Sequence, residues 1–128
     1  MSIDLNHTIV HVKDAREGAE FLADLFGLPA PAPFAHFMVV ELANGVSLDF
    51  MTTAGAVSPQ HYAFLVSEDE FGAIFGRIKA RGMAYWADPA KERAGEINRR
   101  DGGRGVYFDD PSGHFLEILT RPYGSGEN

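Results

Sequence analysis

Two spacings of apolar residues run along the chain, and they follow one another in the same order twice. Residues 5–12 are rich in β-branched side chains, which is typical of a strand. Apolar residues then recur at positions 15, 19, 22, 25 and 26, the spacing of one helix face, and Gly27 is a suitable helix end. Residues 61–66 and the apolar positions 71, 74, 75 and 78 repeat both patterns before Gly82. The sequence therefore predicts a strand and then a helix at the start of each half.

Both predicted helices carry a start signal. Asp14 is followed three residues later by Glu17, and Ser67 is followed in the same way by Glu70. A short polar residue with a glutamate at this spacing is typical of a capping box, in which the two residues satisfy free backbone N–H groups at the helix start. We therefore expect the helices to begin next to Asp14 and Ser67.

Further strands are predicted after each helix. In the first half, three prolines at positions 29, 31 and 33 favour an extended connection, and strands follow at residues 34–42 and 46–51 around the hairpin dipeptide Asn44-Gly45. In the second half, strands are predicted at residues 83–87, 106–109 and 115–120. The polar residues 88–104 form a loop, and Asp110-Pro-Ser-Gly forms a turn. The predicted fold class is α+β: two βαβββ modules, the second with one weak strand, whose helix-free sheet faces line a curved mixed-sheet trough.

The length of the chain, 128 residues, is typical of a single domain. Residues 52–59 are small and polar and predict a linker between the halves, so the modules are expected at about residues 4–52 and 60–121. The tail at 124–128 is rich in glycine and polar residues, which predicts disorder.

Residues that bind metals occupy matching places in the two halves. Successive side chains of a strand point to opposite faces, so His7, Asp49, His61 and Glu117 are all expected on the face away from their helix. Two imidazoles with one or two carboxylates suit a divalent ion such as Zn, Fe(II), Mn, Co or Ni and leave positions for a substrate. Asp49 is the least secure ligand, because three ligands suffice and a short side chain can instead hydrogen-bond to a ligand.

The remaining histidines have other expected places. His11 shares a face with His7 but lies roughly 13 Å further along the strand, too far for the same ion, and is expected in a pocket or at the surface. His36 is expected on a strand, on the same face as Met38 and Val40, where it would line the trough. His114 directly follows the predicted turn and is expected to be exposed.

Composition and charge exclude several functions. The net charge of −7 argues against a nucleic-acid partner, and the absence of cysteine excludes disulfides and thiolate ligands. No apolar run approaches a membrane span and no signal peptide is evident, so we expect a cytoplasmic protein without membrane contact.

The Gly-rich segment that holds Arg100 and Arg104 indicates a loop, with contact to an anionic substrate as the minority interpretation. Aromatic residues are expected in the core or in the wall of a partly apolar pocket: Tyr85, Trp86, Tyr107 and Phe115.

Three motifs together resemble the vicinal oxygen chelate superfamily, which includes glyoxalase I, extradiol dioxygenases, fosfomycin-resistance thiol transferases and bleomycin-resistance proteins. They are Leu5-Asn-His, Gln60-His and Val106-Tyr-Phe-Asp-Asp-Pro-Ser-Gly-His-Phe-Leu-Glu-Ile, and the resemblance covers about residues 4–121. It implies a divalent metal held by His7, His61 and Glu117. Glyoxalase I adds a carboxylate at the position of Asp49, which departs here from the usual glutamate.

The resemblance and the residues together predict a divalent-metal-dependent enzyme that acts on a small, oxygen-chelating substrate. Asp49 is the candidate base, and Glu117 is expected both to bind the metal and to take part in catalysis. Lyase, isomerase, dioxygenase and thiol-transferase reactions all remain open. The family also implies a homodimer. The alternative is a metal-independent protein of the bleomycin-resistance type that sequesters a drug-like ligand, which the acidic charge and the aromatic residues favour.

Overall fold

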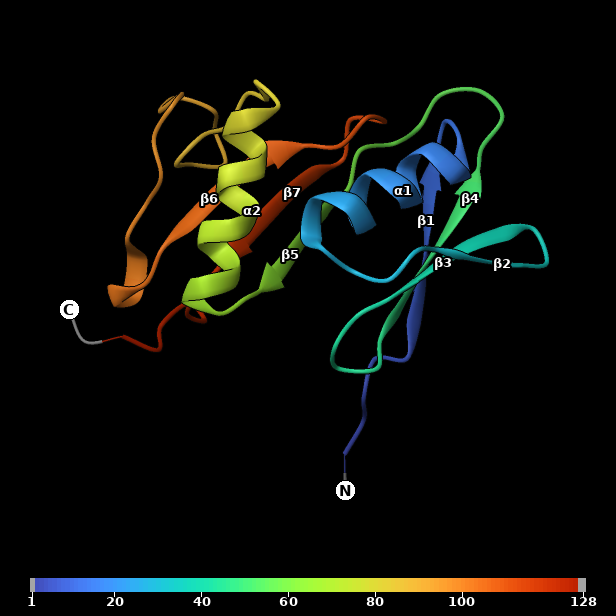
Figure 1. The fold of residues 1–128 in the computed structure, drawn as a ribbon, viewed down its shortest axis with the longest axis horizontal. Coiled ribbons are helices and arrows are strands. Elements are labelled where there is room, and N and C mark those ends of the chain that lie inside the picture. The colour runs from blue at the N-terminus through green and yellow to red at the C-terminus, as the bar shows by residue number, and fades with distance from the viewer. Residues whose placement is uncertain (1, 127–128) are drawn as a thin grey trace. The chain divides into compact units, whose positions relative to one another are not determined.

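The structure is a computed structural model that describes residues 2–126, and the chain divides after Ser58 into two compact units (Figure 1). The first unit contains β1 (His7–Val12), α1 (Ala15–Phe26), β2 (Ala32–Phe34), β3 (Phe37–Glu41) and β4 (Ser47–Thr52). Its four strands form one sheet in the order β1-β4-β3-β2, with β1 parallel to β4 and the other pairs antiparallel. The predicted βαβββ order of this half is confirmed.

The second unit contains β5 (His61–Leu65), α2 (Glu68–Ala80), a 3₁₀ turn η1 (Arg100–Gly102), β6 (Gly105–Asp109) and β7 (Phe115–Leu119). Its strands form a sheet in the order β5-β7-β6, with β5 parallel to β7 and β6 antiparallel to it. Each unit therefore pairs its first strand with its last. The α+β class is confirmed by these two mixed sheets and two helices.

The predicted strand at residues 83–87 is wrong. Of residues 83–87, only Trp86 bridges to β6, through reciprocal backbone hydrogen bonds with Tyr107 of 2.9 Å each. The chain then turns away because the Asp88 side chain accepts hydrogen bonds from the backbone N–H groups of Glu92 and Arg93. The next backbone donor after Trp86, the N–H of Ala87, bonds to the carbonyl oxygen of Arg93 at 3.1 Å and not to β6.

The helix starts differ between the units. At α2 both bonds of the predicted capping box form, between Ser67 and Glu70. At α1 the Asp14 side chain accepts a hydrogen bond from the N–H of Glu17 at 3.0 Å. Gly27 ends α1 with a φ of 68°, the left-handed conformation that glycine adopts without strain.

The predicted strand 34–42 begins too early, and His36 is not on it. Phe34 pairs with Phe37 across a tight β2-β3 turn that contains Ala35 and His36, and His36 is exposed. Pro33 has no N–H to donate, which suits β2 because it is the edge strand of the sheet. His36 therefore does not line a sheet face with Met38 and Val40, which are both buried.

The core of each unit lies between its helix and one face of its sheet. In the first unit the buried strand residues include Val10, Val12 and Phe50. In the second unit they include Phe108 and Ile118, which are both fully buried. Strand alternation places the neighbouring side chains of each strand on the opposite face, where the candidate site residues lie. Within residues 2–126, neither helix has the length and apolar character that crossing a membrane requires.

Candidate functional site

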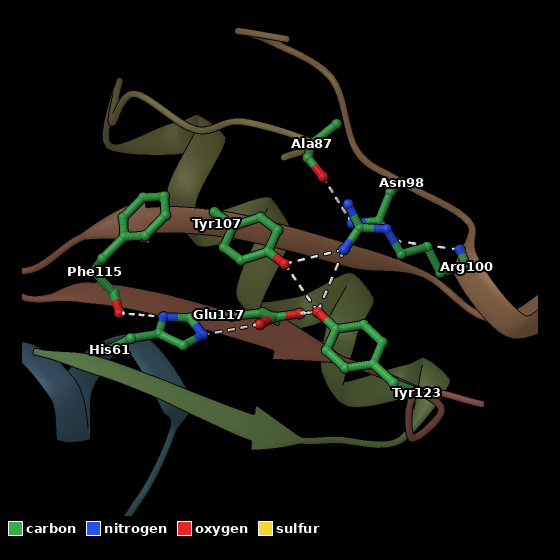
Figure 2. A network of polar contacts seen from close by, with 8 residues as sticks. All are labelled: His61, Ala87, Asn98, Arg100, Tyr107, Phe115, Glu117 and Tyr123. Carbon is green, nitrogen blue, oxygen red and sulfur yellow. Dashed lines mark hydrogen bonds and ion pairs between the residues drawn. The ribbon is translucent and has the colours of Figure 1, made fainter. Parts of the chain in front are cut away.

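His61 and Glu117 meet on the helix-free face of the second sheet. They lie on the adjacent parallel strands β5 and β7, where His61 pairs with Phe115 and Ala63 pairs with Glu117. Glu117 is only 1% exposed, because its flanking residues pack into the core and other side chains cover its carboxylate. The imidazole Nε2 of His61 lies 3.2 Å from Oε1 of Glu117 (Figure 2). The small Ala63 beside Glu117 leaves room for this diagonal contact.

The proton positions in this pair follow from the chemistry of its partners. Nδ1 of His61 lies 2.9 Å from the carbonyl oxygen of Phe115, which can only accept, so Nδ1 carries a proton. In a neutral imidazole Nε2 is then an acceptor, and it faces a carboxylate oxygen, which is also an acceptor. Two acceptors at this distance need a cation between them, either a proton or a metal ion.

The second oxygen of Glu117 is bound by Tyr123, which belongs to a group of three hydrogen-bonded side chains that we call the tyrosine cluster: Arg100, Tyr107 and Tyr123. The Tyr123 hydroxyl donates a hydrogen bond to Oε2 of Glu117 and lies 2.8 Å from the hydroxyl of Tyr107. The Arg100 guanidinium donates to Tyr107 at 3.1 Å and to Tyr123 at 3.5 Å (Figure 2). Burial, followed by the bond to Glu117, raises the pKa of Tyr123, so its phenol stays protonated as a donor.

His7 and Asp49 lie together on the helix-free face of the first sheet. His7 pairs with Ser47 across the parallel strands, and Asp49 lies two residues further along β4, paired with Ile9. Nδ1 of His7 contacts the side chain of Asn6 at 2.7 Å, and Asp49 accepts a hydrogen bond from Ser47 at 3.1 Å. The predicted faces of all four candidate residues are therefore correct within each unit.

Within residues 2–126, no three His, Asp or Glu side chains gather into one group able to hold a metal ion. His61 and Glu117 nevertheless fit two adjacent positions of such a site. Donor atoms each about 2.1 Å from one ion lie about 3.0 Å apart at a right angle and about 3.4 Å apart at the tetrahedral angle. Their separation of 3.2 Å lies between these values, and a nitrogen with a carboxylate oxygen suits borderline divalent ions.

The prediction that His114 is exposed is wrong, because it is only 1% exposed. Its Nδ1 accepts a hydrogen bond from the backbone N–H of Gln60 at 3.0 Å, and its ring packs edge-on against Tyr62 at 5.7 Å. The backbone N–H of His114 donates a hydrogen bond to the Asp110 carboxylate at 2.8 Å. Burial raises the pKa of Asp110, although this bond and the His114 ring oppose the shift. His114 thus ties the turn before β7 to the start of β5, next to His61.

Several other predicted residues have structural partners. His11 is exposed and contacts the Thr53 hydroxyl at 3.0 Å, as expected of a surface residue. Arg104 donates to Glu68 at 2.8 Å and lies over the ring of Phe71, 4.4 Å from its centre, so it stabilises the start of α2.

The aromatic residues form a row on the second sheet. Tyr107 is buried and stacks on Phe115 at 5.3 Å and on His61 at 5.9 Å. Lys91 lies over Trp86 and Phe115, at 4.5 and 4.9 Å from their ring centres. It also pairs with Asp109 at 3.0 Å.

Sequence reasoning missed Tyr123. It follows the last strand by a few residues and belongs to no periodic pattern, so only its position six residues after Glu117 could have drawn attention. The predicted disorder of residues 124–128 is wrong for 124–126. The backbone N–H groups of Gly124 and Gly126 donate to the Asp101 carboxylate at 3.1 and 3.2 Å. Residues 127 and 128 lie outside the described part of the chain.

Comparisons with known proteins agree with the fold. Residues 4–118 match the family model described as the Glyoxalase/Bleomycin resistance protein/Dioxygenase superfamily. The chain is 30% identical over 122 residues to the glutathione transferase FosA of Serratia marcescens, which covers 89% of this chain and 78% of that protein. The fosfomycin resistance protein FosX of Mesorhizobium loti is 21% identical with a TM-score of 0.68, covering 95% of each chain, and shows likeness of fold alone.

Two solved structures are more similar. Oxidase ChaP-H1 is 63% identical with a TM-score of 0.94, covering 96% of this chain and 99% of that chain. Oxidase ChaP-H2 is 60% identical with a TM-score of 0.96, covering 99% of this chain and 100% of that chain. The similarity to these two proteins therefore extends over almost the whole length of all three chains.

Proposed function

Because the chain belongs to the glyoxalase/bleomycin resistance protein/dioxygenase superfamily, we propose that it is a divalent-metal-dependent oxidase that acts on a small organic substrate. The observation that carries this proposal is the contact of His61 with Glu117, two acceptor atoms 3.2 Å apart that a divalent cation would bridge. The reaction type is supported by the identity of 60% or more with two proteins named as oxidases.

We propose His61, Glu117 and His7 as the ligands of the metal. A set of two histidines and one carboxylate with open positions is the arrangement that Fe(II) oxygenases use, so Fe(II) is the preferred ion of this proposal, with Mn, Co, Ni and Zn as tests. When bound, the ion would supply a Lewis acid for adjacent substrate oxygens and a centre that can change its oxidation state.

The chain's own residues have separate roles in this proposal. Asp49 is the candidate base, because its carboxylate lies on the helix-free face of the first sheet and is fixed at one oxygen by Ser47. Phe115, which is partly exposed and stacks on the buried Tyr107, supplies an aromatic surface beside His61 that would exclude water from a planar substrate. The family further supports a homodimer, which light scattering at micromolar concentration would test.

A thiol transferase is the second candidate function, and the similarity to FosA favours it. The two reactions differ in what they consume. An oxidase consumes oxygen or another oxidant in step with substrate, whereas a thiol transferase consumes a thiol and leaves the oxygen concentration unchanged. A panel of small molecules with neighbouring oxygen atoms, incubated with Fe(II)-loaded protein, separates them through an oxygen electrode and a thiol assay.

Metal binding is the first test, since both candidates require it. Protein purified without a histidine tag and treated with chelator is titrated without oxygen with Fe(II), and in parallel with Mn and Zn. We expect stoichiometric binding and a higher melting temperature, because an ion that binds only the folded state stabilises it. The matched control is His36→Ala, an exposed histidine in a turn. A protein that takes up no ion, and whose melting temperature is the same with and without chelator, would overturn the proposal in favour of metal-independent ligand binding.

A further inference from the structure

The two oxygens of the Glu117 carboxylate have different partners. Oε1 faces His61, and Oε2 accepts the hydrogen bond of Tyr123. We propose that Tyr123 is a positioning residue that turns this carboxylate, so that one oxygen is held and the other is presented beside His61 as a metal ligand. This inference rests on the proposed function, because it concerns the same metal site.

The donor and the acceptor of each hydrogen bond in the tyrosine cluster follow from the chemistry of its groups. Arg100 can only donate, so both phenol oxygens accept from it. The single proton of Tyr123 is committed to Glu117, so the bond between the two phenols runs from Tyr107 to Tyr123. Hydrogen bonds thus point from Arg100 through the tyrosines to the carboxylate (Figure 2), and each donor strengthens the next.

Tyr123 itself is held by the chain on both sides of it. The Asp101 carboxylate accepts hydrogen bonds from the backbone N–H groups of Gly124 and Gly126. Arg121 donates to the carbonyl oxygen of Ser125 at 3.1 Å. Asp101 lies in η1 directly after Arg100, so one short segment anchors the tail and also supplies the guanidinium that binds the phenols. The position of the phenol is therefore set by backbone contacts as well as by its ring.

The bond matters because Glu117 is buried. A buried carboxylate oxygen without a partner is costly, and a carboxylate free at both oxygens can rotate or bind an ion through both of them. The Tyr123 hydroxyl satisfies Oε2 and removes this freedom, which leaves Oε1 for the ion. Hydrogen bonds to metal ligands of this kind commonly change metal affinity by about 10- to 100-fold.

The test compares three variants that each remove one hydroxyl and keep the ring. Tyr123→Phe removes the bond to Glu117, Tyr107→Phe removes a bond one step away, and Tyr85→Phe lies outside the cluster, packed against Phe75. Full-length protein is titrated with Co(II), whose visible absorption reports both affinity and coordination, and with Mn(II). We expect Tyr123→Phe to weaken binding by about 10- to 100-fold and to change the Co(II) spectrum. Tyr107→Phe should have a smaller effect, and Tyr85→Phe none.

The outcomes separate this inference from the proposed function. If the unmodified protein binds no ion, the proposed function fails. If it binds Co(II) but Tyr123→Phe binds equally well or more tightly, with an unchanged spectrum, the positioning role is wrong while the metal site stands. Melting temperatures of the metal-free variants, recorded in parallel, exclude a general loss of folding as the cause of weaker binding.

Discussion

The two units place a histidine and an acid at equivalent positions of their paired strands, but they differ in whether the two side chains touch. In the first unit His7 pairs with Ser47, and the acid lies two residues beyond that partner, at Asp49. In the second unit His61 pairs with Phe115, and the acid again lies two residues beyond, at Glu117. Yet only the second pair has a direct contact of histidine with carboxylate among the described hydrogen bonds and ion pairs.

Side-chain length and the neighbouring residue account for this difference. Glu117 has one more methylene than Asp49 and lies beside Ala63, so its carboxylate spans the diagonal to His61. Asp49 lies beside the larger Ile9, and among residues 2–126 its hydrogen bond is with Ser47 on its own strand. A repeated backbone thus places equivalent residues equivalently, but the side chain decides whether they touch.

The largest expected effect is the loss of metal from the second unit. Replacing either partner there, as in His61→Ala or Glu117→Ala, should abolish stoichiometric metal binding. Asp49→Asn should retain most of it and lose activity if Asp49 is the base. Titration of the three variants with Zn or Mn measures the difference. Equal loss in all three would mean that Asp49 is a fourth ligand, and the comparison of the units would fail.

Exchanging the lengths of the two acids sharpens the comparison. Glu117→Asp should bring the carboxylate out of reach of both His61 and Tyr123, and we expect at least about 10-fold weaker metal binding. Asp49→Glu should leave the metal affinity of the second unit's pair in place, because that pair does not involve Asp49. Isothermal titration with Mn(II) gives both affinities. If Glu117→Asp binds as tightly as the unmodified protein, side-chain length is not the cause of the difference.

The buried histidine of the second unit gives the next effect. His114→Ala should lower the free energy of unfolding by about 3 kcal/mol, because it removes buried packing and leaves the Gln60 N–H without its acceptor. His36→Ala, in the exposed turn of the first unit, should change it by less than about 0.5 kcal/mol. Urea unfolding of both variants measures this contrast. Equal stability of the two would show that the contacts of His114 do not stabilise the fold.

The smallest expected effect concerns the helix starts. Ser67→Ala should destabilise the protein by about 1 kcal/mol at neutral pH, since it removes the hydroxyl that accepts the Glu70 N–H, one of the two bonds of the capping box of α2. The backbone hydrogen bond from Ser67 lowers the pKa of Glu70 below its ordinary value of 4.5. A carboxyl group whose pKa is lower in the folded state than in the unfolded state adds to the free energy of unfolding above its unfolded pKa. This added stability is lost as the pH falls through the folded pKa. Ser67→Ala keeps the backbone N–H that binds Glu70, so Glu70→Gln is the variant that tests this pH dependence. Plots of melting temperature against pH for Glu70→Gln and the unmodified protein should converge below pH 4.5, and a constant difference would contradict this.

Local patterns predicted the elements and the faces of the site residues well. The end of α1 at Gly27 and the order of elements along the first unit follow from signals within a few residues. The face of Glu117 follows from strand alternation. His114 was misjudged because its acceptor role depends on Gln60, which is 54 residues away. The contact of Tyr123 with Glu117 depends on Arg100 and Asp101, in a loop without any periodicity.

The parallel pairing of first with last strands has a consequence for how the protein folds during its synthesis. A ribosome must release residues through Leu119 before β5 can pair with β7, because β7 is the last strand of its unit. Until then β5 exposes an unpaired strand edge, and such pairing between distant segments is slow. The carboxylate of Glu117 arrives with that final strand. Formation of the metal-binding pair therefore reports completion of the second unit, and the first unit, complete at Thr52, can fold well before it.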